Sequence, residues 1–196
     1  MTTHADHTPT FDASCWTCRD RGDWMQTNSG GRFYPLDPRP DEIDPEDIAH
    51  ALSLLCRYGG HVDRFYSVAE HCVLMSEWVP PEHALAALLH DATEAYVVDV
   101  PRPLKRYLSN YRDIEGMAWR AITARFEVPA RLPEVVHEAD NRIILTERAE
   151  LLSRAERWPQ MDDYAPLPVV VTGWSPHKAE RIYRARLAAL CDGGAT

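Results

Sequence analysis

Six stretches of the sequence pair a helix start signal with apolar residues at helical spacing. In the first, Asp44 is a candidate N-cap and Pro45 occupies the first helical position, where no backbone N–H is needed. In the second, Ser67 and Glu70 have the spacing of a capping box. The stretches are DPEDIAHALSLLCRYGG, SVAEHCVLMSEW, PPEHALAALLHDATEAY, NYRDIEGMAWRAITARF, PEVVHEADNRIILTERAELLSRAERW and SPHKAERIYRARLAALC. Because strand patterns are scarce, we predict an all-α, single-domain helical bundle.

The N-terminal part of the chain differs from this helical remainder. Residues 1–20 are predicted to form an N-terminal extension, and 21–196 the folded domain. Residues 21–44 are rich in Gly, Pro and Asp, which predicts turns and a short hairpin around NSGG. The extension contains two pairs with zinc-like spacing, but a single CxxC pair is weak evidence, and metal binding there stays open. These residues are His4, His7, Cys15 and Cys18.

Charge and composition exclude several classes of partner. The formal net charge of −9 argues against a nucleic-acid or membrane-surface binder, since both partners are anionic. A small anionic substrate remains compatible, because a metal and a few cations can reverse the field inside one pocket. The sequence has neither an apolar run long enough to cross a bilayer nor a signal peptide. Its five scattered cysteines do not suggest a disulfide framework, so we expect a reduced, cytoplasmic protein.

Four polar residues interrupt or end apolar helical patterns. The stretch LLHDATEAYVVDVPRPLK places His90 and Asp91 at the end of an apolar run, while His71 and Asp140 break apolar stripes on two other predicted helices. Each residue alone has an ordinary alternative, such as a hydrogen-bonded core histidine, a helix cap or a buried salt bridge. Together, two imidazoles and two carboxylates from three helices suit a borderline divalent ion such as Mn, Fe, Co, Ni or Zn.

The order His, His–Asp, Asp resembles that of the HD-domain metal-dependent phosphohydrolases. The resemblance implies an HD-type helical fold and one divalent transition metal ion held by His71, His90, Asp91 and Asp140. The segment HDATEAYVVDVPRPLK is similar to that of bacterial 5′-deoxynucleotidases in this family, where the Glu, the second Asp, the Pro-x-Pro and the Lys recur. Compact phage members, including deoxyadenosine triphosphate triphosphohydrolases, share features of EDIAHALSLLCRYGGH and FYSVAEH.

The resemblance also implies chemical roles for further residues. Glu94 follows His90 by four residues, so on one continuous helix it would share that face and orient or deprotonate the attacking water. Asp99 would act on the water, the leaving 5′-oxygen or the sugar 3′-hydroxyl. Arg57 and Lys105 would bind the substrate phosphate. The alternatives are a solvated acid, a turn residue, a helix cap and a surface lysine. The candidates for a sugar or base pocket are Tyr58, Gly59, Gly60, His50 and His61.

The expected activity is metal-dependent hydrolysis of (deoxy)nucleotides between the 5′-oxygen and the α-phosphorus. The products would be a nucleoside plus phosphate from a monophosphate, or a nucleoside plus triphosphate from a deoxynucleoside triphosphate. By analogy with the family we expect a small-molecule nucleotide as partner and a homodimer or higher homo-oligomer. Two alternatives stay open: a scaffold that binds nucleotide without turnover, and a cyclic-dinucleotide or alarmone hydrolase.

Overall fold

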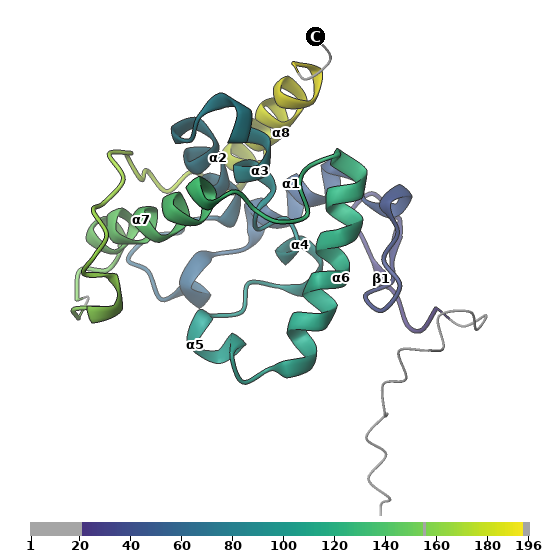
Figure 1. Ribbon diagram of the computed structural model, residues 1–196, viewed down its shortest axis with the longest axis horizontal. Coiled ribbons are helices and arrows are strands. Elements are labelled where there is room, and N and C mark those ends of the chain that lie inside the picture. The colour runs from purple at the N-terminus through teal and green to yellow at the C-terminus, as the bar shows by residue number, and fades with distance from the viewer. Residues whose placement is uncertain (1–20, 155, 194–196) are drawn as a thin grey trace, which may run out of the picture.

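Helices make up most of the described chain, which comprises residues 21–154 and 156–193 of a computed structural model (Figure 1). The α-helices are α1 (Pro45–Leu54), α2 (Val68–Trp78), α3 (Ala84–Leu89), α4 (Glu94–Val97), α5 (Arg102–Lys105), α6 (Ser109–Phe126), α7 (Glu134–Leu151) and α8 (Pro176–Asp192). The 3₁₀ helices are η1 (Pro40–Glu42), η2 (Arg57–Gly60), η3 (Pro81–His83) and η4 (Pro159–Met161). This architecture confirms the all-α, single-domain prediction.

The predicted N-terminal hairpin is present, and strands within the described ranges are confined to it. Strand β1 (Met25–Gln26) pairs antiparallel with β2 (Arg32–Phe33) across the NSGG turn. The predicted extension and its four candidate zinc ligands lie outside the described residues. None of the helices in the described ranges has the length and hydropathy needed to span a bilayer.

Helix α2 lies at the centre of the fold. It packs against α1, α3, α7 and α8. In Figure 1, α2, α3 and α8 lie together, with α7 and α6 on opposite sides of them. The helix is buried from Val68 to Ser76 and contributes to both apolar clusters of the interior: Val68 and Cys72 to one, Leu74 and Met75 to the other. Any polar side chain on α2 therefore needs a partner inside the protein.

The sequence signals for the helix starts are confirmed by the caps. The side chain of Asp44 accepts a hydrogen bond from the N–H of Glu46, and the side chain of Ser175 accepts one from the N–H of Lys178. Such caps satisfy backbone donors that have no partner within the helix. The predicted N-cap Asp44 therefore places the start of α1 correctly, and Ser175 caps α8 in the same way.

The third predicted helix is wrong as a continuous element. It is interrupted between α3 and α4, where Ala92 N donates to Leu89 O at 2.8 Å and Glu94 N donates to Asp91 O at 3.0 Å, both in tighter i to i−3 bonds. The carbonyl of Ala87 would accept from residue 91 in a continuous α-helix. It accepts instead from the ring of His90 at 2.8 Å. The prediction that residues 90 and 94 share one α-helical face therefore does not hold.

Two other predicted helices end earlier than expected. Helix α7 ends at Leu151, although the predicted stretch reached Trp158. Helix α1 ends at Leu54, so Arg57 does not close that helix and lies in the separate turn η2. In η2 the backbone adopts positive φ at Tyr58, Gly59 and Gly60, a conformation that an α-helix cannot continue.

The capping box at the start of α2 is only half formed. The hydroxyl of Ser67 accepts from the N–H of Glu70 at 3.1 Å, as predicted. The fully buried carboxylate of Glu70 does not reach back to Ser67. It accepts from the backbone N–H groups of Thr172, Gly173 and Trp174 at 2.9, 3.0 and 2.5 Å. Glu70 thus joins α2 to the segment that precedes α8.

Replacement of Glu70 by Ala should lower the free energy of unfolding by about 3 kcal/mol, because three backbone donors lose a charged acceptor. Chemical denaturation monitored by circular dichroism measures this loss. Glu77→Ala on the exposed face of the same helix is the matched control and should change stability by less than about 0.5 kcal/mol. Equal stabilities of the two variants would contradict the assignment.

Candidate metal centre

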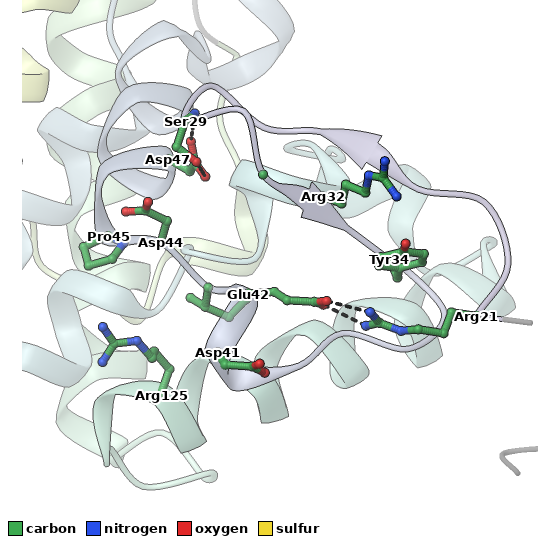
Figure 2. Close-up of a pocket in the computed structure, with 12 residues that line it drawn as sticks. Arg21, Ser29, Arg32, Tyr34, Asp41, Glu42, Asp44, Pro45, Asp47 and Arg125 are labelled. Carbon is green, nitrogen blue, oxygen red and sulfur yellow. Dashed lines mark hydrogen bonds and ion pairs between the residues drawn. The ribbon is translucent and has the colours of Figure 1, made fainter. Parts of the chain in front are cut away.

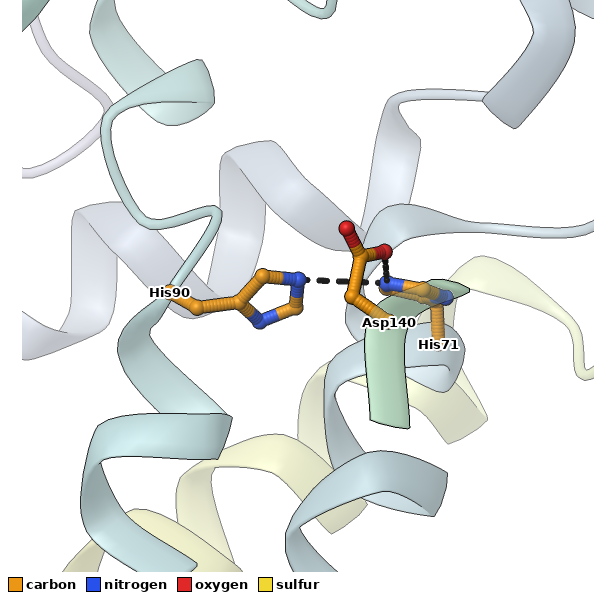
Figure 3. A group of neighbouring side chains, drawn as sticks. All are labelled: His71, His90 and Asp140. Atoms are coloured by element: carbon orange, nitrogen blue, oxygen red, sulfur yellow. Dashed lines mark hydrogen bonds and ion pairs between the residues drawn. The ribbon is translucent and has the colours of Figure 1, made fainter. Parts of the chain in front are cut away.

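The four predicted metal ligands converge from α2, the turn after α3, and α7. His71 Nε2 lies 3.2 Å from His90 Nε2, and it lies 3.6 Å from both Asp91 Oδ2 and Asp140 Oδ1. His90 Nε2 lies 3.2 Å from Asp91 Oδ2. Figure 3 shows the rings of His71 and His90 pointing toward each other, with the carboxylate of Asp140 beside them. The sequence prediction therefore selects residues that the fold brings together, and this group could hold a metal ion.

Hydrogen bonding leaves the facing nitrogens of the two imidazoles as acceptors. His90 Nδ1 lies 2.8 Å from the carbonyl oxygen of Ala87, which can only accept, so Nδ1 carries the proton. His71 Nδ1 lies 2.6 Å from Oε1 of Glu147. The two Nε2 atoms would then face each other at 3.2 Å with no proton between them. A cation is the natural occupant of that position, and the two nearby carboxylates complete a donor set for it.

A second group of potential ligands shares part of this site. Cys72, His90 and Asp91 also bring three ligand atoms close together. However, the nitrogen that His90 turns toward Cys72 is already bonded to a carbonyl, and burial raises the pKa of the Cys72 thiol to about 11. Because His90 can offer only its Nε2 to an ion, the set that contains His71 and Asp140 is the better metal site.

Cations balance the carboxylates of the cluster. Arg57 Nη1 lies 3.2 Å from Asp91 Oδ2. The exposed Arg102, on α5, pairs with Asp140. Burial would raise the pKa of Asp91, but positive charge on His90 and His71 in their protonated, metal-free forms, together with Arg57, outweighs this effect and holds that pKa well below its usual range. Asp91 is therefore ionised, as a metal ligand must be.

Glu147 is a central residue that the sequence analysis missed. It is fully buried on α7, and its carboxylate accepts from the hydroxyls of Tyr58 at 2.5 Å and Tyr66 at 2.9 Å, besides its contact with His71. Burial would raise its pKa, but Arg57 and His71 lower it to about 2. The signal was available, since Glu147 follows Asp140 by two helical turns and so lies on the same face of α7.

The two predicted catalytic carboxylates lie beside the cluster in a desolvated setting. Glu94 is buried, and its Oε2 has no hydrogen-bond partner among the described residues. Burial raises the pKa of Glu94 well above its ordinary value, and the negative charges of Asp91 and Asp99 add to this effect. Burial also raises the pKa of Asp99, against the opposing influence of Arg57. The pKa of each group therefore lies above that of an exposed carboxylate, a perturbation that is common at functional sites.

The backbone just before Asp99 is strained. Val98 has φ 70° and ψ 151°, a region that β-branched residues rarely occupy. Two hydrogen bonds hold it there: its N–H donates to Glu94 O at 3.0 Å, and its carbonyl accepts from the hydroxyl of Tyr111 at 2.7 Å. The loop that carries Asp99 is thus tied to α4 and α6.

A cavity of about 380 Å³ opens beside the cluster. Its wall includes His90, Asp91 and Asp140, and it continues along α6 and the start of α7. Predicted phosphate ligand Lys105 faces this cavity, but its Nζ lies 2.6 Å from Glu115 Oε1. The remaining lining residues are Thr93, Arg112, Gly116, Trp119, Leu132, Val136 and His137.

The candidates for the sugar or base pocket are not gathered at this cavity. His50 Nδ1 lies 3.5 Å from Glu180 Oε2 on α8, and the hydroxyl of Tyr58 is bound to the buried Glu147. Gly59, Gly60 and His61 are exposed in and after η2. None of these five residues lines the cavity beside the cluster.

A second cavity, of about 540 Å³, lies between the hairpin, η1 and α1 (Figure 2). Its charged groups are largely engaged with one another. Arg21 pairs with Glu42 at 2.6 Å, and Asp47 accepts from the N–H and hydroxyl of Ser29 at 2.6 and 2.8 Å. No predicted site residue lines it. The candidate functional site is therefore the smaller cavity beside the His–Asp cluster.

The fold and this cluster define an all-α protein with a buried centre able to hold a metal ion. The chain is 42% identical over 140 residues to the uncharacterized protein YfdR of Escherichia coli K12. The matched region covers 71% of the chain and 79% of YfdR. The chain therefore belongs to the YfdR family. It is also 37% identical over 126 residues to the uncharacterized protein RCAP_rcc00048 of Rhodobacter capsulatus, covering 59% of the chain and 64% of that protein. A scan against protein-family models finds no match.

Metal-stripped protein should bind one equivalent of a divalent ion such as Co²⁺, and His90→Ala should weaken this binding by about 100-fold or more. The loss should exceed the 10- to 100-fold effect of removing a group that only supports a ligand. Calorimetric titration measures the affinity. Replacement of the exposed His177 on α8 by Ala is the control and should leave it unchanged. Wild-type affinity in His90→Ala would remove this residue from the centre.

Proposed function

We propose that this protein is an HD-type, metal-dependent phosphohydrolase that cleaves (deoxy)nucleotides between the 5′-oxygen and the α-phosphorus. The observation that carries the proposal is the combination of two facing imidazole acceptors with an unpartnered, buried carboxylate, Glu94, beside them. A site for storing an ion has no use for a desolvated acid next to its ligands, whereas a hydrolase needs one to handle a water molecule.

The centre would take one divalent transition ion: Co, Mn, Ni, Fe or Zn. The donor set of His71, His90, Asp91 and Asp140 suits these borderline ions better than Ca or Mg, which prefer oxygen ligands alone. When bound, such an ion supplies Lewis acidity toward a phosphoryl oxygen. Arg57, which lies against Asp91, adds a fixed positive charge at the same place.

Glu94 is the group we assign to the attacking water. Its raised pKa makes Glu94 a stronger base than an exposed carboxylate, and its Oε2, which has no hydrogen-bond partner among the described residues, is available to accept a hydrogen bond from water. We assign Asp99 either to a second proton transfer, at the water or the leaving 5′-oxygen, or to binding of the sugar 3′-hydroxyl. Glu94 begins α4 and Asp99 follows the strained Val98 at the end of that helix, so the two carboxylates are held at opposite ends of one short element.

The cavity suits a small anionic substrate with an aromatic part. Its volume of about 380 Å³ lies in the range of small-molecule sites. Lys105 and Arg112 supply cations, and Trp119 and Val136 supply apolar surface on the same wall. This combination matches a nucleotide, whose phosphates need positive charge and whose base needs a flat apolar contact. We further propose a cytoplasmic homo-oligomer, as in the family that the sequence resembles.

The primary test is product analysis after incubating Mn²⁺- or Co²⁺-loaded protein with deoxy- and ribonucleoside mono-, di- and triphosphates. Nucleoside with inorganic phosphate from monophosphates identifies a 5′-nucleotidase. Nucleoside with intact triphosphate identifies a triphosphohydrolase. Cleavage of a cyclic dinucleotide or alarmone instead would replace the proposed substrate. Tight nucleotide binding without any product would overturn hydrolysis in favour of a binding scaffold.

Glu94→Gln should lower kcat by about 10²- to 10⁴-fold, because the variant keeps the shape of the side chain but cannot accept a proton. Its affinity for the metal ion should stay within a few-fold of the wild type. Steady-state kinetics and metal titration on the same preparation measure both quantities. Glu77→Gln on the exposed face of α2 is the control and should leave both unchanged. Undiminished turnover would remove Glu94 from the mechanism.

Glu115→Gln should lower KM by about two- to fivefold and leave kcat unchanged. The variant frees Lys105 from its 2.6 Å ion pair, so a substrate phosphate no longer competes with Glu115 for that cation. The size of the effect follows from the modest free energy of a partly exposed ion pair. Glu138→Gln, whose partner Arg142 lies on the same helix, is the control. A raised KM would show that Glu115 itself contacts the substrate.

A further inference from the structure

The carboxylate of Glu147 connects parts of the chain that lie far apart in the sequence. It is fully buried on α7, and it touches one side chain from α2 and three from the region around η2. The contacts join Oε1 to His71 Nδ1 at 2.6 Å and Tyr66 Oη at 2.9 Å, and Oε2 to Tyr58 Oη at 2.5 Å and Arg57 Nε at 3.4 Å. A buried carboxylate with this many donors is the hub of a polar network, and such a network orients the side chains that it joins.

The contact with His71 determines which nitrogen of that ring is available. Two phenol hydroxyls and a guanidinium surround Glu147, so its carboxylate acts as an acceptor. The proton of a neutral His71 then resides on Nδ1, and Nε2 keeps its lone pair directed at His90 and Asp140. A carboxylate on the far nitrogen also increases the donor strength of an imidazole toward a metal ion.

The same carboxylate holds the η2 turn. Tyr58 has φ 58°, which is unfavourable for a residue with a side chain. Its hydroxyl donates a hydrogen bond to Glu147. Arg57, the next residue back, lies between Glu147 and the ligand Asp91. One buried group therefore orients a ligand of the centre and the cation beside it.

We infer that Glu147 is a positioning residue of the metal centre, which orients His71 for coordination and fixes the Arg57–Tyr58 turn against the neighbouring ligand Asp91. The inference rests on the metal centre of the proposed function but not on nucleotide hydrolysis. It assigns Glu147 no contact with substrate or with the ion.

The test compares Glu147→Gln with Tyr66→Phe. The first variant keeps the size of the side chain but removes the charge that orients the imidazole. The second removes one hydrogen bond to the same oxygen and leaves the contact with His71 intact. Co²⁺ affinity is measured by titration of metal-stripped protein against a competing chelator, and the visible spectrum of bound Co²⁺ reports on the ligand geometry.

Glu147→Gln should bind Co²⁺ about 10- to 100-fold more weakly than the wild type, with an altered spectrum, whereas Tyr66→Phe should stay within about threefold. If Glu147→Gln does not fold, Glu147→Asp is measured in its place by the same criterion, because its shorter side chain withdraws the carboxylate from His71. Wild-type affinity and spectrum in the folded Glu147 variant would overturn the inference.

These measurements separate the inference from the proposed function. Weakened Co²⁺ binding in Glu147→Gln without hydrolysis of any nucleotide by the wild type supports the positioning role and overturns the hydrolase. If the wild type hydrolyses a nucleotide and the Glu147 variant keeps wild-type Co²⁺ affinity, the hydrolase is supported and the positioning role is overturned. Absence of Co²⁺ binding by the wild type would overturn both.

Discussion

The burial of α2 is the constraint on which the rest of the structure depends. This helix is enclosed from Val68 to Ser76, so each polar side chain that it carries inward must find a partner on another element. Glu70 accepts hydrogen bonds from the backbone amides of residues 172–174, and His71 Nδ1 contacts the carboxylate of Glu147 on α7. Ser76 accepts a hydrogen bond from Arg186 on α8 at 2.9 Å. These three contacts place α7, α8 and the segment between them around one helix. The candidate metal centre follows from the same requirement, since the second nitrogen of His71 also needs a partner and faces His90 and Asp140.

The sequence predicted the features that depend on local chemistry. Caps such as Asp44 act within one helical turn, and a histidine or aspartate on an apolar stripe must turn inward, so the ligand set could be found without the fold. The interruption after α3 was missed because no Gly or Pro marks it, and it coincides with the bond between the ring of His90 and a carbonyl. The spacing of Glu147 from Asp140 indicates that it faces the cluster, but its partners could not be predicted because they lie 76 to 90 residues away in the chain.

The charges around the centre are balanced before any substrate arrives. Asp91, Asp140 and Glu115 pair with Arg57, Arg102 and Lys105 respectively. A protein of net charge −9 thereby keeps three cations close to one cavity without leaving them unpaired. An anion that bound here would have to displace these partners, so its affinity would reflect the difference between two sets of ion pairs and not the full attraction of three cations.

The attachment of Glu70 has a consequence for the order in which the protein matures. All four ligand residues lie between positions 71 and 140, but the amides that satisfy Glu70, the neighbour of His71, come from residues 172–174. While the ribosome is translating the segment between residues 140 and 172, all four residues have been synthesised but α2 still lacks the partner of Glu70. The contacts that satisfy Glu70, and with them the final position of α2 around His71, therefore cannot be complete before residues 172–174 have been synthesised.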